Sequence, residues 1–461
     1  MPPSADTPVI FALPEWLPHL GGLATFYAQL ARCRSEQGLS TLILTTQRNA
    51  ENPGWPGLDV VSVLEEKNAG FVRLCQLLPE HYEVAALALS TGAAMAQWLR
   101  KHAPADAVVF AAEFMGYASA LTGPGLPPLV VTAHGSLGQI AARSHGGGAA
   151  SPDLPLLRLL ESDALLRAHA VSAYSPANAA EWSAALGRNV PCVDPPYFLS
   201  QDLDTQGKAE VTATAQAAPL TGVVLGRLQD WKGAQTLASA LEMLGPDAPV
   251  RIDWYGSDTP TAPGAVSMAA WLAEHHPRIW QKTFRWHGPV PREDALRQQV
   301  GADFALIPSR WDTLNFTVLE AMAAAKPALV STGAGASYLI EHGVTGLVFP
   351  VDDAAALAHT LQRIAETPAS LPPLGRAARA ALGERLSPAA CVNRYETLAH
   401  QARETAANPL HALKADSAAG TFLPLLEAVT AADTLPRHSG RDLLGALTRK
   451  LSQRLGMDRE P

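Results

Sequence analysis

The stretch Phe304-Ala-Leu-Ile-Pro-Ser-Arg-Trp-Asp-Thr-Leu-Asn-Phe-Thr-Val-Leu-Glu320 decides the fold that we expect for this chain. It opens with a short apolar run and closes with the start of an amphipathic segment. The sequence therefore predicts a strand over Phe304–Pro308, a loop, and a helix over Thr317–Ala325. A strand that leads into a helix in this way is the repeating unit of parallel sheets.

The same alternation of short apolar runs and amphipathic segments recurs on both sides of this stretch. Further strands are predicted at Val9–Leu13, Ser40–Thr45, Ala107–Ala111, Leu129–Thr132, Gly222–Gly226, Val250–Tyr255 and Ala328–Ser331, and further helices at Gly22–Gln37 and Gly233–Leu244. This pattern predicts an α/β fold with mainly parallel sheets that helices cover on both faces.

The alternation stops in a polar, alanine-rich segment and then restarts, which indicates two α/β domains. A chain of 461 residues is long enough for two or three domains. We expect an N-terminal Rossmann-like domain over residues 1–200, a linker over 201–219, a C-terminal Rossmann-like domain over 220–385, and C-terminal helices over 386–461 that partly return to the N-terminal domain. Two such domains leave a deep cleft between the carboxyl ends of their strands, where these sheets bind ligands.

Composition excludes several classes of function. The formal charge of −8 gives no support for nucleic-acid binding, because that requires a basic surface. The four cysteines are scattered without metal-ligand spacing and suit a reducing compartment. The N-terminus lacks a basic region followed by a long apolar run, and no window reaches 18 uninterrupted apolar residues, so we expect a cytoplasmic protein.

Residues 441–457, RDLLGALTRKLSQRLGM, have the pattern of an amphipathic helix with leucines on one face and basic residues elsewhere. One interpretation is weak peripheral contact with the inner face of the cytoplasmic membrane. The other, which the pattern favours, is a helix packed on the protein itself, because amphipathic helices usually face a core.

Two carboxylates in the opening stretch are candidate ligand-binding groups. Asp312 falls in the predicted loop and Glu320 in the first turns of the helix. The free backbone N–H groups at a helix N-terminus suit a phosphate or sugar hydroxyls, and a carboxylate can accept two hydrogen bonds from a ribose diol. Their spacing alone favours a plainer interpretation, a turn aspartate and an acid that compensates the helix dipole.

Basic residues in Gly226-Arg-Leu-Gln-Asp-Trp-Lys-Gly233 change that preference. This segment connects a predicted strand to a helix, and Arg227 and Lys232 flank the turn. Either cation alone is typical of a solvated surface. Two cations at the carboxyl end of a strand can neutralise a diphosphate leaving group without a metal.

Two features of the first half of the chain fit the same chemistry. The pair Gly21-Gly22 follows a strand and opens a helix, so a phosphate or sugar can approach the backbone there, although an ordinary tight turn has the same pattern. His134 lies where a strand ends and a glycine turn begins. It can hydrogen-bond a sugar hydroxyl, carry a proton at neutral pH, or cap the strand end as a structural histidine.

Taken in order, these segments resemble the retaining glycosyltransferases of family 4, which have the GT-B fold. The similar pieces, between about residues 9 and 400, are Gly21-Gly22, Thr132-Ala-His134-Gly, Gly226-Arg-Leu with Lys232-Gly233, Trp254-Tyr-Gly256, Trp286-His-Gly288-Pro-Val290, Ala302–Ser309, Leu319-Glu-Ala-Met322 and Gly343–Val348. Asp202-Leu-Asp204 matches the metal-binding Asp-x-Asp of a different glycosyltransferase architecture, but it lies in the predicted linker.

The resemblance implies a role for each candidate residue. Arg227 and Lys232 would hold the diphosphate with help from Gly21 and Gly22, and Glu320 would bind the ribose. The transferred sugar would be held by Asp312 and by the backbone of Thr313, Leu314, Asn315 and Phe316, and His134 would contact the same sugar. The base would meet the backbone of Gly288, Pro289 and Val290. It also implies transfer with retention to a glycan or lipid-linked acceptor, with neither a metal nor a cofactor.

The chain departs from the family at the sugar-binding loop. The family's Glu-x7-Glu becomes Asp312-x7-Glu320, and its usual Glu-Gly-Phe-Gly-Leu becomes Asp312-Thr-Leu-Asn-Phe316. The shorter acid and the bulkier loop predict a changed sugar preference. Two alternatives stay open: a degenerate, non-catalytic partner of another transferase that binds nucleotide or glycan, and a sugar-nucleotide epimerase of the same fold.

Overall fold

The computed structural model describes residues 8–18, 21–64, 83–143, 153–197 and 219–408. The chain divides into two compact units. Unit 1 comprises residues 1–138, 150–172 and 392–461, and unit 2 comprises residues 139–149 and 173–391. The segment 441–457, Asp202, Asp204 and nearly all of the predicted linker lie outside the described residues.

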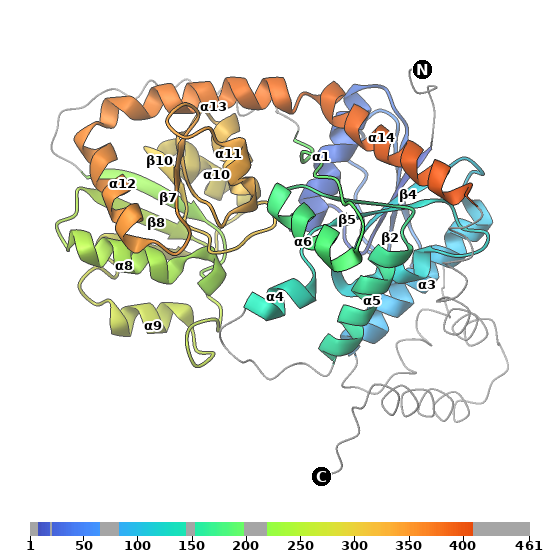
Figure 1. Cartoon of the computed structure of the whole chain (residues 1–461), viewed down its shortest axis with the longest axis horizontal. Coiled ribbons are helices and arrows are strands. Elements are labelled where there is room, and N and C mark those ends of the chain that lie inside the picture. Colours follow the sequence, from blue (N-terminus) through green and yellow to red (C-terminus); the bar gives the residue numbers. More distant parts are fainter. Residues whose placement is uncertain (1–7, 19–20, 65–82, 144–152, 198–218, 409–461) are drawn as a thin grey trace, which may run out of the picture. The chain divides into compact units, whose positions relative to one another are not determined.

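The core of unit 1 is a six-stranded sheet in the order β3-β2-β1-β4-β5-β6 (Figure 1). Its strands are β1 Val9–Leu13, β2 Thr41–Thr45, β3 Leu58–Ser62, β4 Val108–Ala112, β5 Leu129–Ala133 and β6 Ala170–Ala173. The pairs from β3 through β5 are parallel. The strand order reverses between β1 and β4, which is the position where open α/β sheets bind ligands.

Helices enclose the unit 1 sheet. They are α1 Gly22–Glu36, α3 Glu83–His102, the 3-10 segment η2 Phe114–Leu121, α5 Asp153–Arg167 and the C-terminal helix α14 Pro388–Ala406. From Val392 onward α14 belongs to unit 1, and an ion pair between Arg34 and Glu396 ties it to α1. The ring of Tyr395 lies 6.0 Å from that of Phe26, so the end of the chain contributes to the first core.

Unit 2 has a second six-stranded parallel sheet, in the order β12-β11-β10-β7-β8-β9. Its strands are β7 Leu220–Leu225, β8 Val250–Tyr255, β9 Phe284–Gly288, β10 Phe304–Ile307, β11 Ala328–Ser331 and β12 Leu347–Phe349. Its longer helices are α6 Pro176–Leu186, α8 Ala234–Leu244, α9 Met268–His275, α10 Arg292–Gly301, α11 Phe316–Ala323, α12 Ala354–Glu366 and α13 Leu371–Arg385.

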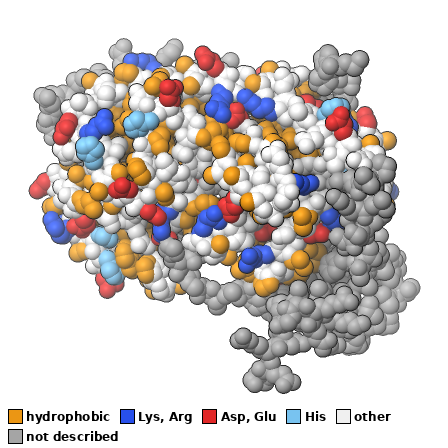
Figure 2. Space-filling view, viewed as in Figure 1, with side chains coloured by type: hydrophobic (Ala, Val, Ile, Leu, Met, Phe, Trp, Pro, Cys, Tyr) orange, Lys and Arg blue, Asp and Glu red, His pale blue; other side chains and the backbone are white. Residues whose placement is uncertain are grey.

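The predicted strands and helices are confirmed, most within one residue and β7 two residues early at its start. The α11 helix ends at Ala323, two residues before the prediction, because Ala325 adopts the left-handed conformation at φ 53°. Strands β3, β6, β9 and β12 were not predicted, and they are the four edge strands of the two sheets. In the described chain no helix is long and apolar enough to cross a membrane. On the face in Figure 2, acidic and basic side chains are interspersed.

Candidate functional site

The loop between β10 and α11 is built around Asn315. This residue adopts φ 82°, ψ 90°, a conformation that glycine tolerates best and asparagine next best. Its side-chain Oδ1 accepts a hydrogen bond from the backbone N–H of Thr317 at 3.2 Å and so caps α11. The second glycine of the family's loop is thus replaced by the residue that best combines a positive φ with a helix cap.

A neighbouring turn over Gly333–Ala336 holds the backbone of this loop. The N–H of Asp312 donates to the carbonyl of Gly333 at 3.0 Å, and the N–H of Gly335 donates back to the carbonyl of Asp312 at 2.9 Å. A Cβ on Gly335 would lie 2.1 Å from the carbonyl oxygen of Thr313. Because no real side chain tolerates that distance, Gly335 lets the two loops touch.

The loop after β7 packs against the loop after β10. Lys232 forms an ion pair with Asp312, and both side chains are partly exposed. Gly233 has φ 84°, and a Cβ there would lie 1.9 Å from the carbonyl oxygen of Pro308. Arg310 contributes a further link, because its guanidinium donates to both carboxylate oxygens of the buried Asp230 at 2.8 and 2.9 Å.

These two loops line one small hollow at the carboxyl ends of β7 and β10. Its walls include Gly226, Lys232, Pro308, Ser309 and Asn315. Arg227, which directly follows Gly226, is exposed to solvent and has no ion pair among the residues that the structure describes. A hollow lined by one lysine, with an exposed arginine beside it at the ends of parallel strands, suits a phosphate-bearing ligand.

Glu320 lies on α11 with its side chain only 7% exposed, and Arg292 forms an ion pair with it. Sequence reasoning missed Arg292. The signal was available, since Arg292 comes two residues after the predicted base-binding segment Gly288–Val290 and begins α10. Its guanidinium orients the buried carboxylate of Glu320, which suits recognition of a diol.

Two tryptophans fix the glycine turns beside this site. The indole Nε1 of Trp254 donates to the carbonyl of Gly226 at 2.8 Å, and that of Trp286 donates to the carbonyl of Gly256 at 2.9 Å. The N–H of Gly256 in turn donates to the carbonyl of Gly288 at 2.8 Å. The turns that carry Arg227 and the predicted base-binding segment are therefore joined by one hydrogen-bonded row.

In unit 1, His134 follows β5, with its ring centroid 4.6 Å from Phe26 and 5.5 Å from Tyr27. Burial of the imidazole lowers the pKa of His134 to about 3. The interpretation that it carries a proton at neutral pH is wrong, because desolvation disfavours the charged form. A neutral imidazole can still donate or accept one hydrogen bond with a hydroxyl.

The predicted Gly21-Gly22 turn does open a helix, since Gly21 is the N-cap of α1. A Cβ on Gly21 would lie 2.5 Å from a carboxylate oxygen of Glu15, whereas a Cβ on Gly22 would meet nothing within 4 Å. The Glu15 carboxylate is the end of a flexible side chain that can move away, so packing does not require the first glycine. The open space at the second leaves room for a ligand against the helix N-terminus.

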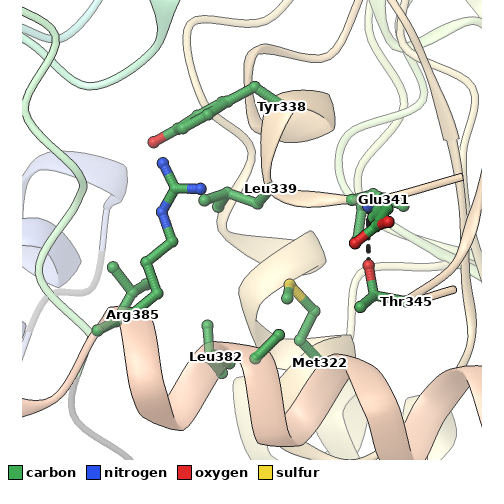
Figure 3. Close-up of a pocket in the computed structure, with 10 residues that line it drawn as sticks. Met322, Tyr338, Leu339, Glu341, Thr345, Leu382 and Arg385 are labelled. Atoms are coloured by element: carbon green, nitrogen blue, oxygen red, sulfur yellow. Dashed lines mark hydrogen bonds between the residues drawn. The ribbon is translucent and has the colours of Figure 1, made fainter.

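A larger cavity of about 320 Å³ lies elsewhere in unit 2, and none of the predicted site residues lines it. Figure 3 shows Tyr338 and Arg385 at one end and Glu341 with Thr345 at the other. The Tyr338 hydroxyl donates to Asp194 at 3.0 Å, and Arg385 binds the same carboxylate at 2.8 and 2.9 Å. These polar groups are satisfied by one another and hold the 192–197 segment to α13.

Comparison with known proteins adds three kinds of similarity. The family described as glycosyl transferases group 1 matches residues 219–367, and the glycosyl transferase 4-like domain matches residues 21–193. Glycogen synthase of Mycobacterium tuberculosis is 30% identical over 172 residues, which is 36% of this chain. The chain spans about two fifths of the length of that relative, 39%.

Two solved structures share the fold over most of the chain. Sucrose-phosphate synthase from Thermosynechococcus elongatus superposes with a TM-score of 0.65 and 18% identity, over 87% of this chain and 100% of that one. HepE from Anabaena, in complex with UDP and glucose, superposes with a TM-score of 0.59 and 18% identity, over 86% of this chain and 100% of that one. With its two six-stranded sheets and these family matches, the chain belongs to the group 1 glycosyltransferases, of the family 4 type with a GT-B fold.

Proposed function

We propose that this glycosyltransferase moves a sugar from a nucleotide-diphosphate donor to a hydroxyl of a glycan or lipid-linked acceptor, with retention of configuration and without a metal ion. The observation that carries the proposal is the hollow at the ends of β7 and β10, which Lys232 and Asn315 line and where Asp312 forms an ion pair with Lys232. That HepE was solved with UDP and glucose supports a nucleotide-sugar donor.

The diphosphate is assigned to Arg227 and Lys232. The Lys232 side chain is 22% exposed and its ammonium is already directed by Asp312, so a phosphate can reach it without a large rearrangement. Arg227 is exposed at the end of β7 and can close on the same group. Preorganised cations that meet the charge developing on a leaving group lower the barrier by several kcal/mol.

The nucleoside is assigned to Glu320 and to the backbone of Gly288, Pro289 and Val290. The Glu320 carboxylate, held by Arg292, accepts hydrogen bonds from the two ribose hydroxyls. Gly288 has φ 76°, so the turn presents its backbone without a side chain in the way. Backbone groups then recognise the edge of the base.

The transferred sugar is assigned to Asp312 and to the backbone of Thr313, Leu314, Asn315 and Phe316. Gly21 and Gly22 add to phosphate binding, and the neutral His134 hydrogen-bonds a sugar hydroxyl. In the reaction the acceptor oxygen bonds to the anomeric carbon on the face from which the diphosphate departs. The bond from that carbon to the phosphate oxygen breaks, and the acceptor proton passes to that oxygen, so the products are the glycoside and the nucleoside diphosphate.

Calorimetric titration with UDP, GDP and ADP tests the donor site. We expect one of them to bind, and Lys232→Ala to weaken it about 10- to 100-fold, because a charge-assisted contact to phosphate is lost. Lys282→Ala, which removes an exposed lysine of the same unit, is the control and should bind normally. No binding to any of the three, or binding indifferent to Lys232, would contradict the proposal.

Product analysis tests the reaction itself. NMR of the new glycoside should show the donor's anomeric configuration, and chelation with EDTA should leave the rate unchanged. An inverted product overturns retention. Nucleotide binding without donor hydrolysis or transfer would favour the non-catalytic partner, and epimerised nucleotide sugar formed without an acceptor would favour the epimerase.

A cytoplasmic location with weak membrane contact through residues 441–457 stays a prediction from the sequence. Co-sedimentation with anionic vesicles should fall when the chain is truncated at Pro436. Unchanged co-sedimentation would remove the membrane contact from the proposal.

A further inference from the structure

Two buried carboxyl groups of unit 1 converge on the loop that follows β5. Glu113 comes directly after β4 and is 0% exposed, and Glu161 lies on α5 and is 1% exposed. Carboxylates are almost never fully buried unless something in the fold compensates them. The hydrogen-bond partners of Glu113 and Glu161 therefore indicate the role of these two side chains.

Glu113 binds the first two residues of the loop. Its Oε2 accepts a hydrogen bond from the N–H of His134 at 2.7 Å, and its Oε1 accepts one from the N–H of Gly135 at 2.6 Å. Gly135 has φ 123°, a value that residues with a Cβ avoid. Both oxygens of one side chain thus hold the backbone at the point where it turns away from the sheet.

Glu161 binds the end of the same loop, where the short helix α4 Leu137–Arg143 begins. Its Oε1 accepts from the N–H of Leu137 at 2.9 Å and from that of Met115 at 3.1 Å, and its Oε2 lies 3.5 Å from the N–H of Gly138. Between them, the two carboxyl groups take the backbone N–H groups of four of the five residues from His134 to Gly138.

This arrangement is costly, because it relies on backbone dipoles in place of cations. In the described part of the chain, no Lys or Arg forms an ion pair with Glu113. Burial, with repulsion from Glu161, raises the pKa of Glu113 to about 8, and burial raises that of Glu161 to about 7. Among the other titratable groups, Tyr117 interacts electrostatically with Glu113, and Arg158 interacts with Glu161.

Backbone strain adds to the cost. Met115 adopts φ 63° without being a glycine, and this conformation presents its N–H to Glu161. The next residue, Gly116, packs so tightly on α5 that a Cβ would lie 2.3 Å from the Cβ of Leu160. Strained backbone and buried carboxyl groups persist where a function requires a fixed geometry.

We propose that Glu113 and Glu161 are positioning residues, which fix the His134–Gly138 loop in the conformation that sugar transfer requires. This inference rests on the proposed function, in which His134 contacts the donor sugar. Replacement of Glu113 by Gln would put an amide NH₂ where an acceptor oxygen now meets a backbone N–H. One of the two hydrogen bonds is then lost, and the loop loosens at His134 or Gly135.

Hydrogen exchange measured by mass spectrometry on the full chain tests the loop directly, without any substrate. We expect Glu113→Gln to speed exchange in the peptide covering 134–138 at least about 10-fold. The matched control is Asp153→Asn, since Asp153 is also buried and accepts the N–H groups of Val84 at 3.3 Å and Ala85 at 3.1 Å. It should speed exchange at 84–85 and leave 134–138 unchanged.

Kinetics test the purpose of the loop. Release of nucleoside diphosphate from UDP-glucose, GDP-mannose or ADP-glucose should show kcat lowered about 10- to 100-fold in Glu113→Gln, with the donor KM within about threefold of the wild type. Asp153→Asn should keep the wild-type kcat at a temperature well below its melting point.

Each result decides. Unchanged exchange at 134–138 in Glu113→Gln overturns the inference, and so does faster exchange with a kcat equal to that of Asp153→Asn. If the wild type turns over none of the three donors while the loop loosens as expected, the proposed function has failed, and the role of the carboxyl groups in holding the loop stands.

Discussion

The loop after β5 in unit 1 and the loop after β10 in unit 2 both lie at the carboxyl ends of sheet strands, and buried or partly buried carboxyl groups adjoin each of them. The groups that compensate these carboxyl groups differ between the two units. In unit 2 the carboxylate of Asp312 in the loop after β10 and that of Glu320 in the following helix α11 are balanced by cations, Lys232 and Arg292 respectively. In unit 1 the carboxyl groups behind the loop after β5 are balanced by backbone N–H groups. The first arrangement leaves cations available for an anionic ligand, and the second fixes a backbone shape.

This difference has an energetic consequence. A partly exposed cation can leave its carboxylate and bind an incoming phosphate. The cost is small, because the cation is still solvated and its surface ion pair is weak. A carboxylate without a cation in a dry interior is tolerated only as long as its hydrogen-bond donors stay in place. We therefore expect unit 2 to be governed by side-chain charge and unit 1 by backbone geometry and pH.

The largest expected effect breaks the close contact between the two loops of unit 2. Gly233→Ala places a Cβ against the carbonyl of Pro308 at a residue with φ 84°, and should lower the free energy of unfolding by about 4 kcal/mol. Gly264→Ala is the matched control, since Gly264 has φ 80° but open space around it, and should lose about 1 kcal/mol. If urea unfolding gives the same loss of unfolding free energy for both variants, backbone strain at positive φ accounts for the whole effect and the contact with Pro308 adds nothing.

The next effect sharpens the contrast in pH dependence. Between pH 4.5 and 8 the folded state holds more protons on Glu113 and Glu161 than the unfolded state does, so the stability of unit 1 should fall as pH rises through that window. The low pKa of His134, about 3, acts the other way, and stability should also fall as pH drops from 6.5 toward 3.

Urea unfolding at pH 5.5 and pH 8.5 measures this dependence, with hydrogen exchange of unit 1 peptides as the probe of unfolding. We expect a loss of about 3 kcal/mol between the two pH values in the wild type. Glu113→Gln removes one titrating group and should flatten the change. A variant with the wild-type slope would mean that Glu113 does not titrate in this range.

A smaller effect concerns the buried acid behind the β7 loop. Arg310→Ala leaves Asp230, 1% exposed, without its bidentate partner and should cost about 2 kcal/mol in thermal or urea unfolding. Arg297→Ala removes an arginine whose pairs are exposed and should change stability by less than about 0.5 kcal/mol. Similar effects for the two variants would remove the distinction between buried and surface pairs in unit 2.

The smallest effect tests the departure from the family's loop. Asn315→Ala removes the cap of α11 and places alanine at φ 82°, so we expect a loss of about 1 to 2 kcal/mol. Asn315→Gly restores the family's residue and should stay within about 0.5 kcal/mol of the wild type. A less stable glycine variant would show that the Asn315 side chain does more than cap the helix.

The sequence assigned Lys232 and Asp312 to one candidate site, and the structure brings these two side chains together. Lys232 and Asp312 follow neighbouring strands of one parallel sheet, so their approach is a consequence of strand order. Prediction missed Arg292, because its pairing with Glu320 depends on how helix α10 packs beside helix α11. It also failed for the charge of His134, which depends on burial by Phe26 and Tyr27 from a distant helix.

The sequence by itself determined the alternation of strands and helices, the division into two α/β domains and the order of the family's motifs. Hydrophobic periodicity and glycine placement are local properties, and a chain carries them wherever it folds. Only the tertiary structure decided which carboxylates meet cations and which meet backbone N–H groups. Glu113 and Glu161 are 48 residues apart in sequence and carry no motif, yet both are buried against the loop of His134 because α5 packs on η2.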